Sequence, residues 1–245
     1  KVDFWATDLN TAEIGNMKRT QNEAASDQFT KDMELYGQTV IDGKREAQIG
    51  YRQELWDGSE GFARRLVIRL FSETLSWRGT AEMLLGRSMQ LSLAAGGQPV
   101  PVFSINLARH KQLIQLERCA VNFPFMPEKY SFFIQGKDSA KFYTLRRHMI
   151  SFGADYSLYD HKGRKIGVLD HQLVNLGGAW MMRIDPEHRT RQLEAVLELF
   201  CAVLKFNRAS KGHVRKLSEQ VLRGKVIADL DHEEEDLYLN PRSRR

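Results

Sequence analysis

Residues 193–206 form the longest segment of this chain that is apolar on nearly every side when drawn as a helix. Its charged residues are Glu194, Glu198 and Lys205, and spacings of four and seven put all three on one narrow stripe. A helix at a protein surface has the opposite pattern, a broad polar face and an apolar stripe. We therefore expect this helix to be surrounded by the preceding strands, by two packed layers, or by another subunit.

The chain has enough apolar material for one sizeable core, since 42% of its 245 residues are hydrophobic. The apolar segment itself is interrupted by Glu198 and Lys205 and is shorter than the roughly 20 residues that span a bilayer. Cys119 and Cys201 are the only cysteines, and no Asn-x-Ser/Thr sequon occurs. We expect an intracellular protein, cytoplasmic or mitochondrial, that could lie at the periphery of a membrane.

Residues 100–185 have the period-two pattern of strands. Alternation or short β-rich runs occur at 102–107, 113–116, 130–134, 142–145, 156–160, 165–169 and 179–185. Between 156–160 and 165–169, Lys162 and Gly163 can provide the positive dihedral angle of a tight hairpin. Pro186 ends the last run, and the apolar helix follows. The pattern predicts an antiparallel meander that leads directly into the helix.

The two ends of the chain have a different composition. Residues 1–50 are polar with few apolar residues in periodic order, which indicates an extended arm. Residues 51–95 have leucines at nearly helical spacing, although Leu66, Ile68 and Leu70 also alternate as in a strand. Residues 208–245 are highly charged, with an amphipathic helix expected at 213–222 and an exposed segment beyond it.

These patterns predict an α+β protein, a barrel-like antiparallel meander around a buried C-terminal apolar helix. We expect an arm over residues 1–50, a globular core over 51–207 and a charged helical or extended tail over 208–245. Within the core we expect 51–95 to be mainly helical, 100–185 to form antiparallel strands and 187–207 to form the buried helix.

The meander and helix carry a family resemblance. Tyr-x-Leu-Tyr-Asp at 156–160, Gly163, Ile166-Gly167 and the apolar helix resemble the tubby-like superfamily, especially its LURP-one-related and phospholipid-scramblase-like branches. The likeness covers about residues 130–207, while 51–95 depart from it. It implies a closed barrel of twelve strands with the C-terminal helix threading its centre. Family members bind phosphoinositides, lie at membranes, or have no known activity.

The sequence lacks the common catalytic signatures. No phosphate-binding Gly-x-x-x-x-Gly-Lys-Ser/Thr, dinucleotide-binding Gly-x-Gly-x-x-Gly, Gly-x-Ser-x-Gly or His-Glu-x-x-His motif occurs. The seven histidines are dispersed, and Cys201 falls on the apolar helix. We therefore expect no catalytic residues, no metal and no cofactor, and an enzyme of unrecognised type is the least favoured alternative.

Basic residues are the main candidates for binding. The formal net charge is +5, and three basic groups could contact the phosphates of anionic lipid headgroups or, less favoured, of RNA. They comprise Arg146 and Arg147; Lys162, Arg164 and Lys165; and Arg208, Lys211, Arg215 and Lys216. We expect a non-enzymatic binding or scaffold protein at a membrane surface. The alternative is an accessory structural subunit of a large protein or ribonucleoprotein assembly, mitochondrial or cytoplasmic, bound to other subunits through the arm and tail.

Overall fold

The computed structural model describes residues 1–5, 27–120, 126–136, 139–150, 153–172 and 178–224. The strands are β1 Val2–Phe4, β2 Met33–Ile41, β3 Lys44–Arg52, β4 Val67–Ser72, β5 Trp77–Met83, β6 Val102–Leu107, β7 Ile114–Arg118, β8 Lys129–Gln135, β9 Ala140–Arg147, β10 Tyr156–Tyr159, β11 Lys165–Gln172 and β12 Ala179–Ile184. The α-helices are α2 Gln53–Trp56, α3 Leu85–Ala94, α4 Arg191–Lys205 and α5 Asn207–Leu222. Single 3-10 turns lie at Gly61–Ala63 and Pro186–His188.

The described strands form a closed, antiparallel barrel of twelve strands. Each strand pairs with its neighbours in sequence, and β1 closes the barrel by pairing with both β2 and β12. In this closing strand, Val2 lies opposite Thr39 on one side and Trp180 on the other. The predicted antiparallel, barrel-like architecture is therefore confirmed, and closure leaves no unpaired sheet edge.

The β10–β11 hairpin has the turn that its sequence predicts. Gly163 has a φ of 75°, a conformation that glycine adopts without steric cost. The Asp160 carboxylate accepts hydrogen bonds from the backbone N–H groups of Lys162 and Arg164, both at 2.9 Å. These two hydrogen bonds stabilise the turn that joins β10 to β11.

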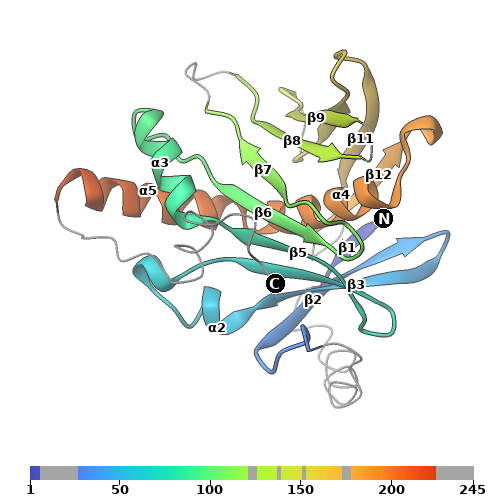
Figure 1. Cartoon of the computed structure of the whole chain (residues 1–245), viewed down its shortest axis with the longest axis horizontal. Coiled ribbons are helices and arrows are strands. Elements are labelled where there is room, and N and C mark those ends of the chain that lie inside the picture. The colour runs from blue at the N-terminus through green and yellow to red at the C-terminus, as the bar shows by residue number, and fades with distance from the viewer. Residues whose placement is uncertain (6–26, 121–125, 137–138, 151–152, 173–177, 225–245) are drawn as a thin grey trace.

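α4 is buried on most of its surface and packs against strands from several parts of the barrel (Figure 1). Phe200 packs against Tyr130 of β8 and Tyr156 of β10, with ring centroids 5.1 and 5.2 Å away. On another side of the helix, the Tyr36 hydroxyl of β2 lies 3.5 Å from the carbonyl oxygen of Ala202. Strands far apart around the barrel thus contact the same helix, which accounts for its apolar residues on nearly every side.

A glycine on β5 allows α4 to approach the wall closely. A Cβ atom added to Gly79 would lie 2.8 Å from Leu107 Cδ2 and 3.4 Å from Leu199 Cδ1. Any larger residue would therefore push Leu107 of β6 away, and its Cβ atom would be in van der Waals contact with Leu199 of α4. At the start of the helix, the Thr190 hydroxyl accepts a hydrogen bond from the backbone N–H of Leu193, as an N-cap does.

The expectation that residues 51–95 are mainly helical is wrong. This segment contributes β4 and β5 to the barrel, and of its longer elements only α3 is helical. β4 is apolar on both faces, because Ile68 and Leu70 point inward while Phe71 packs outside against Met33 and Leu75. A strand that is apolar on both faces has a weaker period-two signal, so its alternating residues could also be read at helical spacing in the sequence.

The expected extended arm over residues 1–50 is also corrected. Residues 2–4, 33–41 and 44–50 belong to β1, β2 and β3, so the core begins at the start of the chain rather than at residue 51. These strands bury residues such as Ala47 and Ile49 and direct polar ones outward, which made the segment look unstructured. Residues 6–26 of the predicted arm lie outside the described residues.

Beyond the barrel, α5 follows α4 after a single residue and runs beside α3 (Figure 1). Its Val214 and Leu217 are buried in the main core cluster, so the helix expected at 213–222 lies within α5. The remainder of the predicted tail, residues 225–245, lies outside the described residues. Among the described helices, none is both long and apolar enough to cross a bilayer.

Candidate functional site

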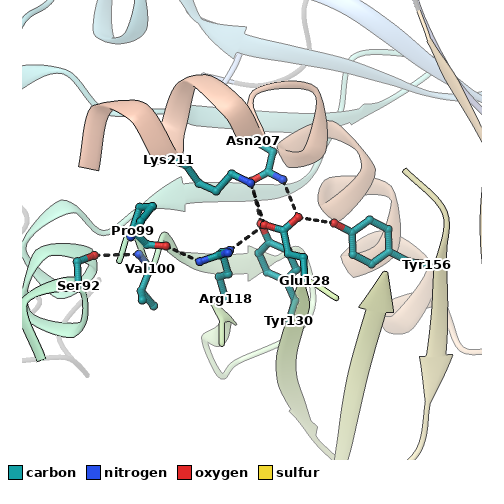
Figure 2. Close-up of polar contacts among 9 residues, drawn as sticks. All are labelled: Ser92, Pro99, Val100, Arg118, Glu128, Tyr130, Tyr156, Asn207 and Lys211. Carbon is teal, nitrogen blue, oxygen red and sulfur yellow. Dashed lines mark hydrogen bonds and ion pairs between the residues drawn. The ribbon is translucent and has the colours of Figure 1, made fainter. Parts of the chain in front are cut away.

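A buried carboxylate, Glu128, lies at the barrel end where α4 ends and α5 begins. Its Oε1 atom accepts hydrogen bonds from Arg118 Nε at 2.7 Å and Lys211 Nζ at 3.1 Å. Its Oε2 atom accepts from the Tyr156 hydroxyl at 2.8 Å and Asn207 Nδ2 at 3.0 Å. One side chain thus connects β7 and β10 with the first two turns of α5 (Figure 2).

Further polar contacts extend this network to α3 (Figure 2). Arg118 also donates from Nη1 to the carbonyl oxygen of Pro99 at 2.6 Å, and the backbone N–H of Val100 donates to Ser92 Oγ at 2.8 Å. The Tyr130 hydroxyl donates to Asn207 Oδ1 at 3.0 Å. A continuous chain of contacts therefore holds α3, the following loop and α5 against one end of the barrel.

The electrostatics keep Glu128 ionised. Burial alone would raise the pKa of this carboxyl, but the Lys211 ammonium and the hydrogen bonds from Arg118 and Tyr156 outweigh it and lower the pKa to about 2. Burial raises the pKa of both Tyr130 and Tyr156, with the nearby carboxylate adding to the effect. Both phenols therefore remain neutral donors at physiological pH.

This network is an anchor for α5. A carboxylate that already accepts four hydrogen bonds has little capacity left to remove a proton from a substrate, and its low pKa leaves no proton to donate. Its chemistry is that of a buried, satisfied ion cluster, which fixes one arrangement of the surrounding helices.

Exposed apolar side chains project at this same end, from the two loops that flank β8 and β9. Met126 is 66% exposed, Met149 is 73% exposed and Ile150 is 97% exposed. The start of β8 pairs with the end of β9, Lys129 opposite Arg146, so both loops leave the barrel from adjacent strands. We call Met126, Met149 and Ile150 the apolar rim. Arg147, which is exposed, lies two residues before Met149.

The nine basic residues singled out in the sequence do not form one surface. Lys211 is bound to Glu128. Arg147 lies at the rim end, while the Arg146 guanidinium stacks 4.6 Å from the centre of the Tyr159 ring on the barrel wall. Lys162, Arg164 and Lys165 lie at the opposite end, because β10 runs away from the rim. Arg208, Arg215 and Lys216 are exposed on α5.

The cysteines and histidines offer little reactive chemistry in the described part of the chain. Cys201 is buried inside the barrel, and burial raises the pKa of its thiol, so it stays protonated. Cys119 is half-buried, with Sγ 3.8 Å from Ser131 Oγ. Among the described residues, no group of three or more His, Cys, Asp or Glu side chains is arranged to hold a metal ion.

Sequence reasoning missed the Glu128 network and the methionines of the rim as a site. Glu128 and Lys211 are 83 residues apart, and no local pattern connects them. The only signal for the rim was that the basic run Arg146-Arg147-His148 is followed directly by Met149 and Ile150. Searches found no matching protein-family model, curated protein or solved structure.

Proposed function

We propose that this chain is a non-enzymatic binding protein with a tubby-like core, and that it docks on anionic membranes through the apolar rim. The observation that carries the proposal is the rim itself: three strongly exposed apolar side chains on adjacent loops, next to the exposed Arg147. Apolar side chains gain by entering the interface of a bilayer, and neighbouring cations gain from its negative surface potential.

The tubby-like assignment rests on the agreement between the family's fold and the architecture of this chain. A closed barrel of twelve strands around a C-terminal helix is what the resemblance implies. β4 and β5 supply strands in the segment where the sequence likeness was missing. Because one fold hosts many functions, the membrane proposal depends on the rim and not on the fold.

The non-enzymatic part of the proposal rests on how the interior is used. Side chains of α4 such as Leu199 and Phe200 occupy the centre of the barrel, where other barrels hold a ligand. The most elaborate polar cluster, around Glu128, is committed to holding α5. We therefore assign the recognition of ligands or membranes to the outer surface of the barrel.

Vesicle flotation tests the proposal directly. The chain should float with vesicles that contain phosphatidylserine or phosphoinositides and remain in solution with neutral vesicles. Ile150→Asp should weaken binding by roughly tenfold or more, because it removes a large apolar side chain from the interface and adds a repelled charge. Since Ile150 is almost fully exposed, the thermal midpoint of the Ile150→Asp protein should equal that of the parent protein.

Leu222→Asp is the matched control, because Leu222 is 67% exposed but lies on α5 and not on the rim. It should float as the parent protein does. Failure of the parent protein to float with any anionic vesicle would contradict the proposal, as would equal weakening by both substitutions.

A second candidate function, a structural subunit of a larger assembly, is favoured by one specific feature. α5 extends past the barrel and exposes Arg208, Arg215, Lys216 and Leu222. A basic helical face with an apolar end suits an acidic partner surface. Native mass measurement on material from its source would detect such an assembly, and a stable free monomer would argue against it.

A further inference from the structure

We propose that a basic groove at the barrel end opposite the apolar rim binds a small, soluble phosphorylated anion. The groove has a volume of about 370 Å³. Its basic side chains are Arg109, His110 and Lys111, from the turn between β6 and β7, and Lys141 on β9. None of the described residues that line it is Asp or Glu.

The described residues that line the groove carry positive charge and no negative charge. Among the described residues, Arg109, Lys111 and Lys141 have no ion-pair or hydrogen-bond partner, whereas Lys211 and Arg118 at the other barrel end are both paired with Glu128. The Nε2 atom of His110 is buried without a hydrogen-bond partner. Like charges held together without a counter-ion repel each other, so an anion that bridges them would be bound favourably.

The backbone at Arg109 supports a binding role. Its φ is 65°, in the left-handed region, which is unfavourable for a residue with a Cβ atom. Glycine would adopt this angle without that cost. An arginine held in a strained turn at the edge of a cationic groove is the kind of arrangement found at ligand sites.

The other lining groups define the class of ligand. The hydroxyl-bearing residues Ser139, Tyr143 and Thr190 add neutral hydrogen-bonding capacity, and Thr190 brings the positive end of the 15-residue α4 to the groove. Such a set suits the several oxygens of a phosphate ester. Because most of the described lining residues have polar side chains, we assign a small polar phosphorylated compound.

Strand direction separates this groove from the rim. β8 runs from Lys129, beside the rim, to Gln135, which lines the groove. A membrane that contacts Met149 and Ile150 would therefore not present its headgroups to Lys111 and Lys141. We accordingly assign the ligand to the soluble phase, and the inference does not depend on the membrane function proposed above.

Isothermal titration with inorganic pyrophosphate, followed by a soluble inositol phosphate, tests the site. Removal of one charge-assisted hydrogen bond weakens binding by about tenfold or more, so Lys111→Gln with Lys141→Gln should weaken it by about a hundredfold. Lys162→Gln is the matched control, because Lys162 is an exposed cation at the same barrel end that does not line the groove. It should bind as the parent protein does.

Arg109→Gly separates binding from stability. It removes a cation from the groove and relieves the strained dihedral, so affinity should fall about tenfold while the thermal midpoint holds or rises. Three results would overturn the inference: no binding of either soluble anion by the parent protein, equal weakening by Lys162→Gln, or binding of phosphoinositide vesicles through Lys111 and Lys141 without binding of the soluble compounds. The Ile150→Asp protein should bind the soluble anions normally.

Discussion

Glu128 stabilises the fold as an ion. Its pKa is about 2 in the folded protein and 4.5 in an unfolded chain, so its contribution is complete above pH 4.5 and is lost as the pH falls toward 2. Glu128→Gln leaves the partly buried Arg118 and Lys211 without a counter-charge, and we expect it to cost about 3 kcal/mol of unfolding free energy at pH 7.

Urea unfolding from pH 2 to 7 would measure both effects. The stability of the Glu128→Gln protein should depend less steeply on pH between 4.5 and 2. Glu117→Gln is the control, since this half-exposed side chain has Oε1 3.8 Å from Arg87 Nη2 and its loss should cost no more than about 1 kcal/mol. Equal losses for the two variants would rule out the anchoring role of Glu128.

Glu198 behaves in the opposite way. It is 1% exposed within α4, and burial raises the pKa of its carboxyl to about 7, although Arg78, with Nη2 3.7 Å from Oε2, opposes the shift. Because the folded pKa exceeds the unfolded value of 4.5, stability from this group is complete below pH 4.5 and is lost as the pH rises to about 7.

Thermal melts between pH 4.5 and 8 would reveal this dependence. At roughly 1.4 kcal/mol for each pH unit between the two pKa values, Glu198 should reduce stability by about 3 kcal/mol across that range. Glu198→Gln should remove the slope, while Glu187→Gln, at a side chain that is 71% exposed, should retain it. A slope that persists in Glu198→Gln would show that another group titrates.

At the scale of the element, α4 is the core around which the strands close. Leu199 and Phe200 are both fully buried, and Phe200 lies between two tyrosine rings. Leu199→Asp or Phe200→Asp would bury an unpaired charge, and we expect each to lower the unfolding free energy by several kcal/mol.

Circular dichroism melts would test the two substitutions. Gln192→Asp provides the comparison, because Gln192 is exposed in the first turn of the same helix, where a negative charge is favourable. It should melt as the parent protein does. A near-normal midpoint for Leu199→Asp or Phe200→Asp would refute the burial of this helix.

In the whole molecule, the two barrel ends differ in how their charges are satisfied. At one end, Glu128 pairs with Arg118 and Lys211, and apolar side chains are exposed beside this network. At the other, Arg109, Lys111 and Lys141 line a groove that has no carboxylate among its described residues. The fold therefore separates two surfaces of different chemistry along one axis: the apolar rim, which we propose docks on an anionic membrane, and the groove, which we propose binds a soluble anion.

The sequence by itself determined the elements whose signals are local. The all-round apolar helix at 193–206 and the hairpin around Gly163 follow from residues within one or two turns of each other, because periodicity and turn preferences act over short distances. Both are found where the pattern puts them, as α4 and as β10–β11. The antiparallel pairing of consecutive strands follows from the same short connections.

Only the tertiary structure decided which distant segments meet. Val2 on β1 closes the barrel against Trp180, and Glu128 joins Asn207 and Lys211 about 80 residues away. The alternation in β4 did not distinguish a strand from a helix because apolar residues lie on both of its faces, and β1 to β3 looked like an arm because many of their outward residues are polar. Burial depends on neighbours that are remote in the chain, so no local pattern could reveal the closure, the network or the groove.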